Sequence, residues 1–364
     1  MRQLMNDAEV KLILGNSNKR FSGVTSTMLQ VLPVQSKLTG TAVLGSHHLP
    51  ENFRTLSFVE LTRLCRKPLP DGSYRVFHAR RNDEMIQALI AKMLFGAKIK
   101  IAFTSTAQRE HSGFSRWLMQ KMDAVITTSN AAAAYLHHRP ADIIVPHGID
   151  ASRFQPTSSR DALWQKTGFP GEFGVGIFGR VRYSKGIDIF VDAALPLLNK
   201  YPGATLVISG HCMPKDRNYL DKINQKINAA GHSQRVVFTG EQPFDALPPL
   251  FAAMSIVAAL SREEGFGLTP LEAMASATAV LTSEAGAWPD VVRDGIDGFR
   301  VPIGDVAATQ QKLDAMLNNP VDTEAMGIAG RERVLEHYTV EREARRLTDF
   351  LLSLANPNGR PNQK

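Results

Sequence analysis

The feature that most constrains the fold is an alternation of short apolar runs with longer stretches of helical periodicity, repeated in two successive series. The helical stretches include residues 84–95, 187–199, 218–230 and 268–276. Most of the apolar runs are continuous, which is typical of parallel strands covered by helices on both faces. The pattern therefore predicts an α/β protein with two doubly wound domains. The apolar runs cover residues 10–14, 41–44, 74–78, 99–103, 124–127 and 143–145, and then 174–178, 204–209, 235–239, 256–260 and 279–283.

A polar stretch that contains Pro156, Pro170 and Gly171 separates the two series. We therefore expect an N-terminal Rossmann-like domain at residues 1–155 and a C-terminal Rossmann-like domain at residues 156–340. No strand is expected after Phe299, and helices should continue to about residue 354. The polar tail at residues 356–364 is expected to be disordered.

Composition narrows the protein class further. With only Cys65 and Cys212 among 364 residues, a secreted fold built on disulfides is not expected. Asp7 and Glu9 interrupt the apolar run that a signal peptide would need. The apolar stretch at 247–260 contains two prolines and is too short to span a bilayer. We therefore expect a cytoplasmic protein without a membrane anchor.

The positive charge is confined to the first part of the chain. Residues 1–150 contain 19 Lys and Arg against 11 Asp and Glu, whereas the rest of the chain contains 23 against 24. An excess of this sign favours an anionic partner such as a phosphorylated substrate, an anionic membrane surface or a nucleic acid, although a solvated surface has the same signature. No patch of interleaved basic and aromatic residues is present, so we do not expect nucleic-acid binding.

Two glycine-containing segments come next to predicted strands. The loop at residues 15–26 leads into a helix, and its backbone amides could approach a phosphate or form an ordinary turn. Gly174, Gly176 and Gly179 match G-x-G-x-x-G literally. There the strand lies within the glycines, whereas a dinucleotide fingerprint follows its strand, so a nicotinamide site is rejected.

The segment at residues 179–186, G-R-V-R-Y-S-K-G, places cations directly after a strand. Its spacing is not that of a P-loop. Basic side chains and free backbone amides are suited to hold a diphosphate and to neutralise it as it leaves. A solvated basic loop is the alternative.

The strongest signal is E-G-F-G-L-T-P-L-E at residues 264–272, which follows one predicted strand and opens a helix. Glu264 and Glu272 would be about 12 Å apart if the segment were helical throughout. The carboxylates of a glycosidase lie about 5–9.5 Å apart. The two glutamates therefore fit contacts at opposite ends of an elongated ligand, with an anion held between them at the helix start. A nucleoside-diphosphate sugar has this layout.

This E-x7-E segment resembles the signature of retaining glycosyltransferases of the GT-B fold, in particular glycosyltransferase family 4. Other segments resemble the family in the same order along nearly the whole chain: the loop at Gly23, P-H-G-I-D at 146–150, Gly179-Arg180, Lys185-Gly186, A-G-A at 285–287 and D-G-F at 297–299. The likeness extends to bacterial lipopolysaccharide core mannosyltransferases, notably over residues 103–129. It implies two Rossmann-like domains facing across a cleft, with a C-terminal helix at about 340–355 packed back on the first domain.

The resemblance also implies roles for individual residues. Glu264 would contact hydroxyls of the donor sugar, Glu272 would contact the ribose, and Arg180 and Lys185 would bind the diphosphate and stabilise the leaving group. Gly23 and the segment Gly265, Phe266, Gly267 and Leu268 would hold sugar and phosphate. The implied reaction is retaining transfer of a hexose, with GDP-mannose as donor and the lipopolysaccharide inner core, an anionic lipid-linked saccharide, as acceptor.

The sequence also allows other donors and other classes of protein. A UDP- or ADP-sugar is the alternative donor, and a glycosidase-like hydrolase or a non-catalytic nucleotide-sugar-binding protein is the alternative class. No D-x-D motif and no Cys/His cluster is present, so neither a metal nor another cofactor is expected.

The chain departs from the family pattern where a donor-contacting histidine is usual. Thr104-Ser105-Thr106 occupies that region and His111 follows, so that Thr106 and His111 are both candidates. The basic amphipathic stretches at 85–95 and 114–122 either pack on a sheet or dock on an anionic membrane, which here would be the cytoplasmic face of the inner membrane.

Overall fold

The computed structural model describes residues 6–19 and 22–356, which form two compact units. Unit 1 contains the described residues as far as His147 together with those from Val340 onward, and unit 2 is Gly148–Thr339. The boundary expected at 155/156 therefore lies within unit 2. The reason is local packing, because the ring of Phe154 lies edge-on to Phe251 of unit 2 with 5.8 Å between centroids. The tail expected to be disordered lies outside the described residues apart from Asn356.

Unit 1 is built on a seven-stranded sheet in the order β3-β2-β1-β4-β5-β6-β7, in which every neighbouring pair is parallel. The five longer strands are almost entirely buried, as their apolar sequences predict, whereas the two-residue strands at the edges, β3 and β7, are partly exposed. Their bounds are β1 Leu12–Gly15, β2 Thr41–Leu44, β3 Thr55–Leu56, β4 Arg75–Ala79, β5 Ile99–Ser105, β6 Ala124–Thr127 and β7 Ile143–Ile144.

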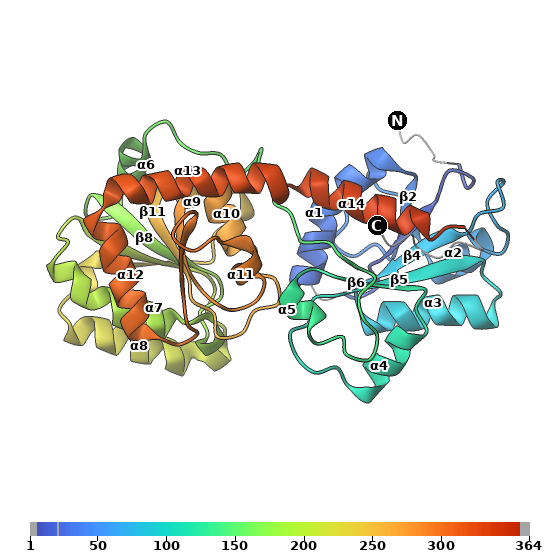
Figure 1. Ribbon diagram of the computed structural model, residues 1–364, viewed down its shortest axis with the longest axis horizontal. Coiled ribbons are helices and arrows are strands. Elements are labelled where there is room, and N and C mark those ends of the chain that lie inside the picture. Colours follow the sequence, from blue (N-terminus) through green and yellow to red (C-terminus); the bar gives the residue numbers. More distant parts are fainter. Residues whose placement is uncertain (1–5, 20–21, 357–364) are drawn as a thin grey trace. The chain divides into compact units, whose positions relative to one another are not determined.

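Helices cover both faces of this sheet (Figure 1). Successive residues of β1 point to opposite faces, so Ile13 packs in the layer of α2, α3 and α4, and Leu12 and Leu14 pack in the layer of α1 and α14. The last helix, α14, thus completes the core of unit 1 beside the first helix, α1. The bounds are α1 Gly23–Leu38, α2 Phe58–Leu64, α3 Asn82–Leu94, α4 Gly113–Gln120, α5 Asn130–Ala133 and α14 Val340–Ser353.

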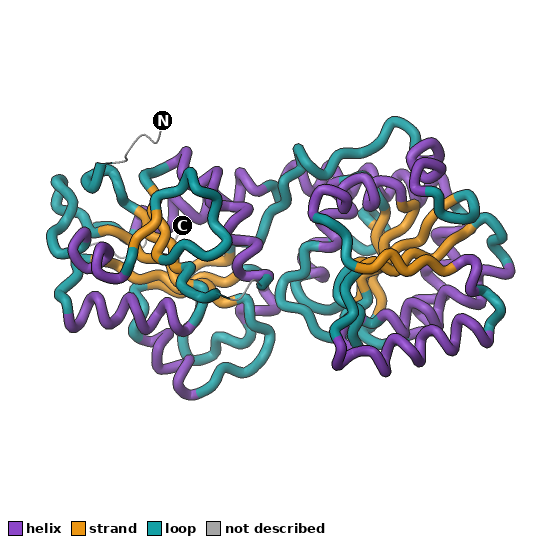
Figure 2. The backbone as a smooth tube through the Cα atoms, turned by 180° about the vertical axis from the view of Figure 1, so that it is seen from behind, coloured by secondary structure: helices purple, strands orange, loops and turns teal. Residues whose placement is uncertain are grey.

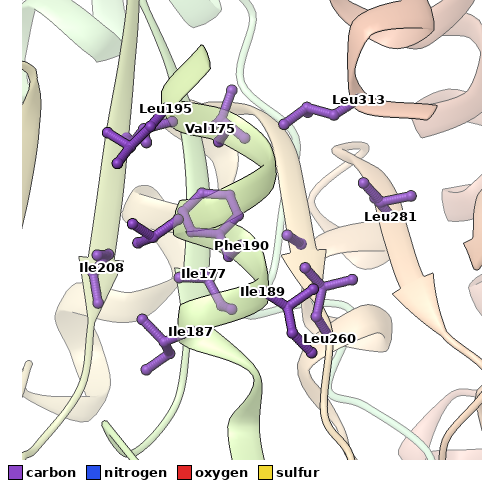
Figure 3. Packing of buried hydrophobic residues seen from close by; sticks show 14 of the residues in the cluster. Val175, Ile177, Ile187, Ile189, Phe190, Leu195, Ile208, Leu260, Leu281 and Leu313 are labelled. Carbon is purple, nitrogen blue, oxygen red and sulfur yellow. The ribbon is translucent and has the colours of Figure 1, made fainter. Parts of the chain in front are cut away.

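Unit 2 repeats the architecture with a six-stranded parallel sheet in the order β10-β9-β8-β11-β12-β13, seen among its helices in Figure 2. On one face, Phe190 of α7 lies over the strand that carries Val175 and Ile177 (Figure 3). On the other face, α6, α9, α10 and α13 cover a second cluster around Phe251 and Met254. The strands are β8 Phe173–Phe178, β9 Ala204–Ser209, β10 Val236–Gly240, β11 Met254–Ala259, β12 Ala279–Ser283 and β13 Gly298–Val301.

The helices of unit 2 alternate with these strands, as the second series of the sequence predicts. Several short 3-10 turns precede or extend them, among them η1 Tyr183–Lys185, η2 Leu195–Asn199, η3 Pro214–Asp216, η4 Ser233–Arg235 and η5 Phe244–Ala246. The α-helices are α6 Arg160–Thr167, α7 Ile187–Ala194, α8 Arg217–Ala229, α9 Leu247–Ala253, α10 Thr269–Ala275, α11 Trp288–Val291, α12 Val306–Asn318 and α13 Pro320–His337.

Two strands of the structure are not among those predicted from the sequence. β3 consists of only two residues, and β13 lies where we expected strands to have ended. β13 forms because Gly298 lies directly against the carbonyl oxygen of Val280 in β12, a backbone approach that a side chain would block. The four residues of β13 are not continuously apolar and include the charged Arg300, so the sequence does not resemble a buried strand.

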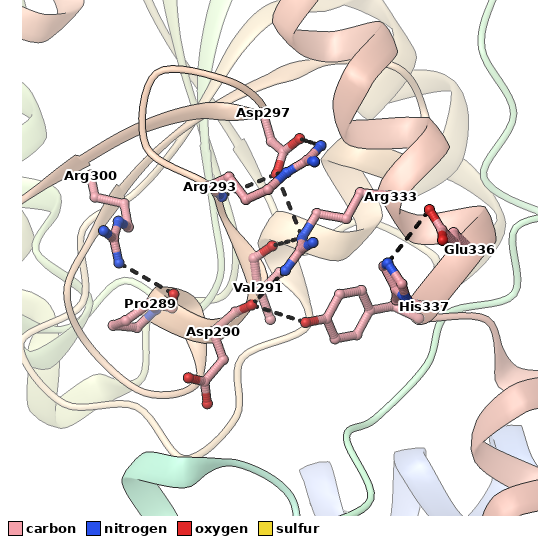
Figure 4. Close-up of polar contacts among 10 residues, drawn as sticks. Pro289, Asp290, Val291, Arg293, Asp297, Arg300, Arg333, Glu336 and His337 are labelled. Atoms are coloured by element: carbon pink, nitrogen blue, oxygen red, sulfur yellow. Dashed lines mark hydrogen bonds and ion pairs between the residues drawn. The ribbon is translucent and has the colours of Figure 1, made fainter.

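Polar contacts fasten the end of α13 to α11 and to the loop between α11 and β13 (Figure 4). The guanidinium of Arg333 donates to the carbonyl oxygens of Asp290 and Val291, and the Tyr338 hydroxyl donates to Asp290 at 3.0 Å. The fully buried carboxylate of Asp297 is neutralised by Arg293. The segment through which the chain leaves unit 2 is therefore firmly held by that unit.

Candidate active site

The candidate site of unit 2 lies at the point where the strand order of its sheet reverses. β8, β9 and β10 follow one another outward in one direction, and β11 then begins on the other side of β8. In doubly wound sheets, ligands bind in the crevice beyond the carboxyl ends of the strands at this switch point. The loops that follow β8 and β11 carry the segments 179–186 and 264–272, so the fold brings together the two motifs that the sequence singles out.

Lys185 ends the short turn η1 in the first of these loops. Gly186 follows with φ of 68°, and a Cβ at this position would collide with the carbonyl oxygen of Leu260, so only glycine lets the loop lie directly on the end of β11. The ammonium of Lys185 forms an ion pair with the carboxylate of Glu264. Both side chains are mostly buried, at 20% and 16% exposure.

The loop around Glu264 is shaped by glycines that lie against its side chain. Gly267 has φ of 77°, and a Cβ there would lie 2.6 Å from Trp288 Nε1 and 2.7 Å from Glu264 Cγ. Gly286, in the loop after β12, would place a Cβ 3.0 Å from Glu264 Cβ. The indole of Trp288 donates to the Gly267 carbonyl at 3.0 Å, and the amide of Gly265 donates to Glu264 Oε1 at 3.2 Å. The carboxylate of Glu264 is therefore held in one place.

The second glutamate of the motif, Glu272, lies in the first turn of α10. The helix begins only at Thr269, so the separation of about 12 Å that we derived for a segment helical throughout does not apply. Pro270 occupies the first turn, where it leaves no hydrogen bond unmade. Burial raises the pKa of Glu272 to about 7, while Arg153 and Lys185 oppose the shift.

The other basic residue predicted for the diphosphate, Arg180, lies exposed immediately after Gly179. Within the described part of the chain, its guanidinium has no hydrogen bond or ion pair. The stem of Lys185 runs past Gly179, with Cε 3.9 Å from where a Cβ would be. Of the two cations predicted for the diphosphate, Lys185 is thus paired with Glu264, and Arg180 has no partner among the described residues. Phe266 is buried beneath the loop and Leu268 is half-buried at the start of α10.

Unit 1 has its own switch point, between β1 and β4. Gly23 begins α1 beside it, with no described atom within 4 Å of an added Cβ. Arg81, which follows β4, donates to the hydroxyls of Ser22 at 2.8 Å and Thr25 at 2.7 Å. The carboxylate of Glu84 accepts hydrogen bonds from the backbone amides of Arg80 and Arg81. The Arg80-Arg81 pair is not among the residues predicted from the sequence, although its position directly after a strand was a usable signal.

The two candidates for the missing family histidine both follow β5. Thr106 comes immediately after the strand, and His111 lies before α4, where its Nε2 is 3.3 Å from the hydroxyl of Ser105. Burial and the neighbouring Arg109 lower the pKa of His111 below its ordinary value, which favours the neutral ring. The donor role of either residue remains a prediction.

No group of three or more His, Cys, Asp or Glu side chains in residues 6–19 and 22–356 is placed to hold a metal ion. None of the helices in the same part of the chain has the length and apolar character to cross a membrane.

Solved structures with a similar fold cover almost the whole chain. A glycosyltransferase from Rickettsia africae superposes with a TM-score of 0.81 over 96% of this chain and 100% of its own, at 16% identity. HepE of Anabaena, in complex with UDP and glucose, gives a TM-score of 0.79 over 94% of this chain and 99% of its own, at 18% identity. At such identities the similarity establishes the fold alone, which is GT-B.

The fold and the sequence together define the protein as a glycosyltransferase, and the chain belongs to the family described as glycosyl transferases group 1, which matches residues 172–319. Among its relatives is the lipopolysaccharide core biosynthesis mannosyltransferase LpcC of Rhizobium leguminosarum bv. viciae, which is 38% identical over 96% of this chain and 98% of its own. LpsB of Rhizobium meliloti, which has the same description, is 36% identical over 95% and 98%.

Proposed function

We propose that this glycosyltransferase transfers mannose from GDP-mannose, with retention of the anomeric configuration, to the inner core of lipopolysaccharide. The observation that carries the proposal is the similarity, over nearly the full length of both chains, to two lipopolysaccharide core mannosyltransferases. The Lys185–Glu264 pair at the switch point of unit 2 supports it, since an acid and a base held together there suit a sugar attached to a diphosphate.

In the proposed donor complex, the diphosphate lies beside Lys185 and Arg180. The diphosphate attracts the ammonium of Lys185, and the carboxylate of Glu264 is then free to accept hydrogen bonds from sugar hydroxyls. Glu272 accepts hydrogen bonds from hydroxyls of the ribose, and backbone amides of residues 265–268 contact the sugar and the phosphate. None of these contacts requires a metal ion, because two basic side chains supply the positive charge.

In the proposed reaction, the bond between the anomeric carbon and the phosphate oxygen breaks, and the acceptor hydroxyl oxygen bonds to the same face of that carbon. The departing phosphate oxygen accepts the proton of the acceptor hydroxyl. Lys185 and Arg180 stabilise the negative charge that develops on the diphosphate as it leaves. The reaction therefore needs no protein nucleophile.

The proposed acceptor is a lipid-linked saccharide with anionic groups, which matches the excess of basic residues in the first part of the chain. Arg80 and Arg81 lie where a doubly wound sheet receives its ligand. They are therefore the first residues of unit 1 that we assign to acceptor binding. Thr106 and His111 follow the neighbouring strand β5 at the same edge of the sheet.

We further propose that the protein acts in the cytoplasm and binds the surface of the inner membrane through α4. Phe114 and Trp117 of this helix are 54% and 50% exposed and stack on each other with 6.1 Å between centroids. The ammonium of Lys121 lies 5.9 Å from the Trp117 ring. Exposed aromatic rings beside a cation suit the interface of an anionic bilayer.

The decisive experiment is transfer by the purified protein with a panel of GDP-mannose, UDP-glucose and ADP-glucose on truncated lipopolysaccharide cores. We expect transfer from GDP-mannose alone, and a product whose anomeric configuration, read by NMR, equals that of the donor. Transfer from a UDP- or ADP-sugar would replace the proposed donor. Release of free sugar without an acceptor would indicate a hydrolase, and nucleotide binding without any turnover would indicate a non-catalytic protein.

A further inference from the structure

The loop that carries Lys185 is held in place by a single arginine from the other site loop. The backbone amide of Arg262 donates to the carbonyl oxygen of Ser184 at 2.9 Å, and its Nη1 donates to the carbonyl oxygen of Tyr183 at 2.7 Å. The guanidinium also lies over the ring of Tyr183, 3.8 Å from its centroid. Arg262 thus holds the two residues that directly precede Lys185 by three separate contacts.

The guanidinium of Arg262 is itself fixed by α7 and α8. It donates to both carboxylate oxygens of Asp188, at 2.9 and 2.8 Å, which is the bidentate geometry that most restricts an arginine. The Tyr219 hydroxyl donates to Asp188 Oδ1 at 2.7 Å and accepts the Asp188 amide at 2.9 Å. Burial alone would raise the pKa of Asp188, but the hydrogen bonds from Arg262 and Tyr219 hold it below its ordinary value.

We propose that Arg262 is a positioning residue for donor binding. Its contacts with the loop backbone hold the ammonium of Lys185 at the donor site. This inference rests on the proposed function, in which Lys185 binds the diphosphate. Three of the five N–H donors of the Arg262 guanidinium are used by Asp188 and by the Tyr183 carbonyl, so most of its hydrogen bonds hold the loop and α7. We therefore assign its contribution to donor affinity to the placement of Lys185, and the double variant described below separates this role from a direct contact with the donor.

A positioning role and a purely structural role differ in how they combine with loss of Lys185. If Arg262 only stabilised unit 2, its removal would change the free energy of unfolding and leave nucleotide affinity intact. If it positions Lys185, its removal weakens nucleotide binding in the wild-type background and has no further effect once the ammonium is gone, which is the signature of coupling in a double-mutant cycle.

The experiment measures GDP dissociation constants by calorimetry for the full-length protein, R262A, K185A and the double variant R262A/K185A, with thermal unfolding as a check of folding. We expect R262A to weaken GDP binding about tenfold and the double variant to bind GDP no more weakly than K185A. R262K is the second variant, in case R262A does not fold. Since lysine cannot form the bidentate contact with Asp188, we expect it to weaken GDP binding in the same direction.

Arg235 offers the matched control. It also fastens unit 2 through backbone carbonyls, of Leu198 and Tyr201, but it lies before β10, at the amino end of the strands and away from the site. R235A should lower the unfolding temperature and leave GDP affinity unchanged.

The outcomes separate the two proposals. Weakened binding in K185A together with unchanged binding in R262A and R262K would overturn the positioning role and leave the donor site intact. Independent, additive losses in the double variant would also overturn it, because Arg262 would then act without Lys185. Unchanged binding in K185A would overturn the proposed donor site, and the positioning role with it.

Discussion

The ammonium of Lys185 and the carboxylate of Glu264 form an ion pair at the switch point of unit 2, although the two residues are 79 positions apart in the sequence. Each side chain neutralises the other while no donor is bound. An anionic ligand that competes for the ammonium therefore also changes the surroundings of the carboxylate. In the proposed donor complex, binding of the diphosphate and binding of the sugar would therefore be coupled through this contact.

We predict that K185A and E264Q each lower kcat/KM for donor by about 100-fold or more, as expected when one electrostatic contact to a reacting group is lost. Steady-state transfer assays measure the effect. The control is K226A, which removes an exposed ion pair with Asp192 in the same unit, worth at most about 1 kcal/mol and remote from the chemistry. Equal activity in K226A and K185A would contradict the site.

We predict that Glu272 makes stability depend on pH. Its pKa is raised from 4.5 to about 7 in the folded protein, so the folded state binds this proton more tightly than the unfolded state. The resulting stabilisation is fully present below pH 4.5 and is lost as the pH rises through 7. Between pH 5 and pH 8, wild type should therefore lose roughly 1–3 kcal/mol relative to E272Q, measured by urea unfolding.

The same residue should make nucleotide affinity depend on pH. If ionised Glu272 accepts ribose hydroxyls, GDP affinity should rise from pH 6 to pH 8 in wild type more steeply than in E272Q. Parallel pH profiles in the two proteins would argue against the ribose contact.

We predict that G267A destabilises the protein by about 1–3 kcal/mol and abolishes transfer. The residue has φ of 77°, and the added Cβ would press on Trp288 and on Glu264. G231A is a matched control with φ of 74° and no atom within 4 Å of its added Cβ. It shares the backbone strain without the collision, so only G267A should lose activity.

We predict that replacing Phe114 and Trp117 together by serine removes binding to vesicles that contain phosphatidylglycerol, measured by cosedimentation, and leaves GDP affinity unchanged. The physical reason is loss of the two exposed rings that would enter the bilayer interface. V321S, which removes a 75% exposed side chain on α13, should bind vesicles like wild type. Vesicle binding that survives in the double variant would exclude α4 as the contact.

Much of the fold could be predicted from the sequence, because buried parallel strands appear there as continuous apolar runs. Strands such as β9 and β12 coincide with the predicted runs 204–209 and 279–283. β13 could not be predicted in this way, because its place depends on a close backbone approach between Gly298 and Val280 that only the folded sheet reveals.

The location of the candidate site was predictable where a motif follows a strand, and its contacts were unpredictable where they cross between loops. Glu264, Glu272 and Lys185 lie within recognisable segments, and the strand order brings those segments to one edge. The bidentate contact between Arg262 and Asp188 joins residues 74 positions apart, and no rule of sequence spacing predicts it. The raised pKa of Glu272 depends on burial, which the linear sequence does not encode directly.

The division of unit 1 between the beginning and the end of the chain has a consequence for biosynthesis. The hydrophobic layer that contains Leu12 and Met28 also contains Leu347 and Leu351 of α14, so it cannot close before α14 has been synthesised. Unit 2 is one continuous segment, so it can fold before unit 1 is complete. During synthesis the apolar side chains of unit 1 that pack against α14 therefore stay uncovered until that helix has been made, and we expect chaperones to bind the nascent chain there.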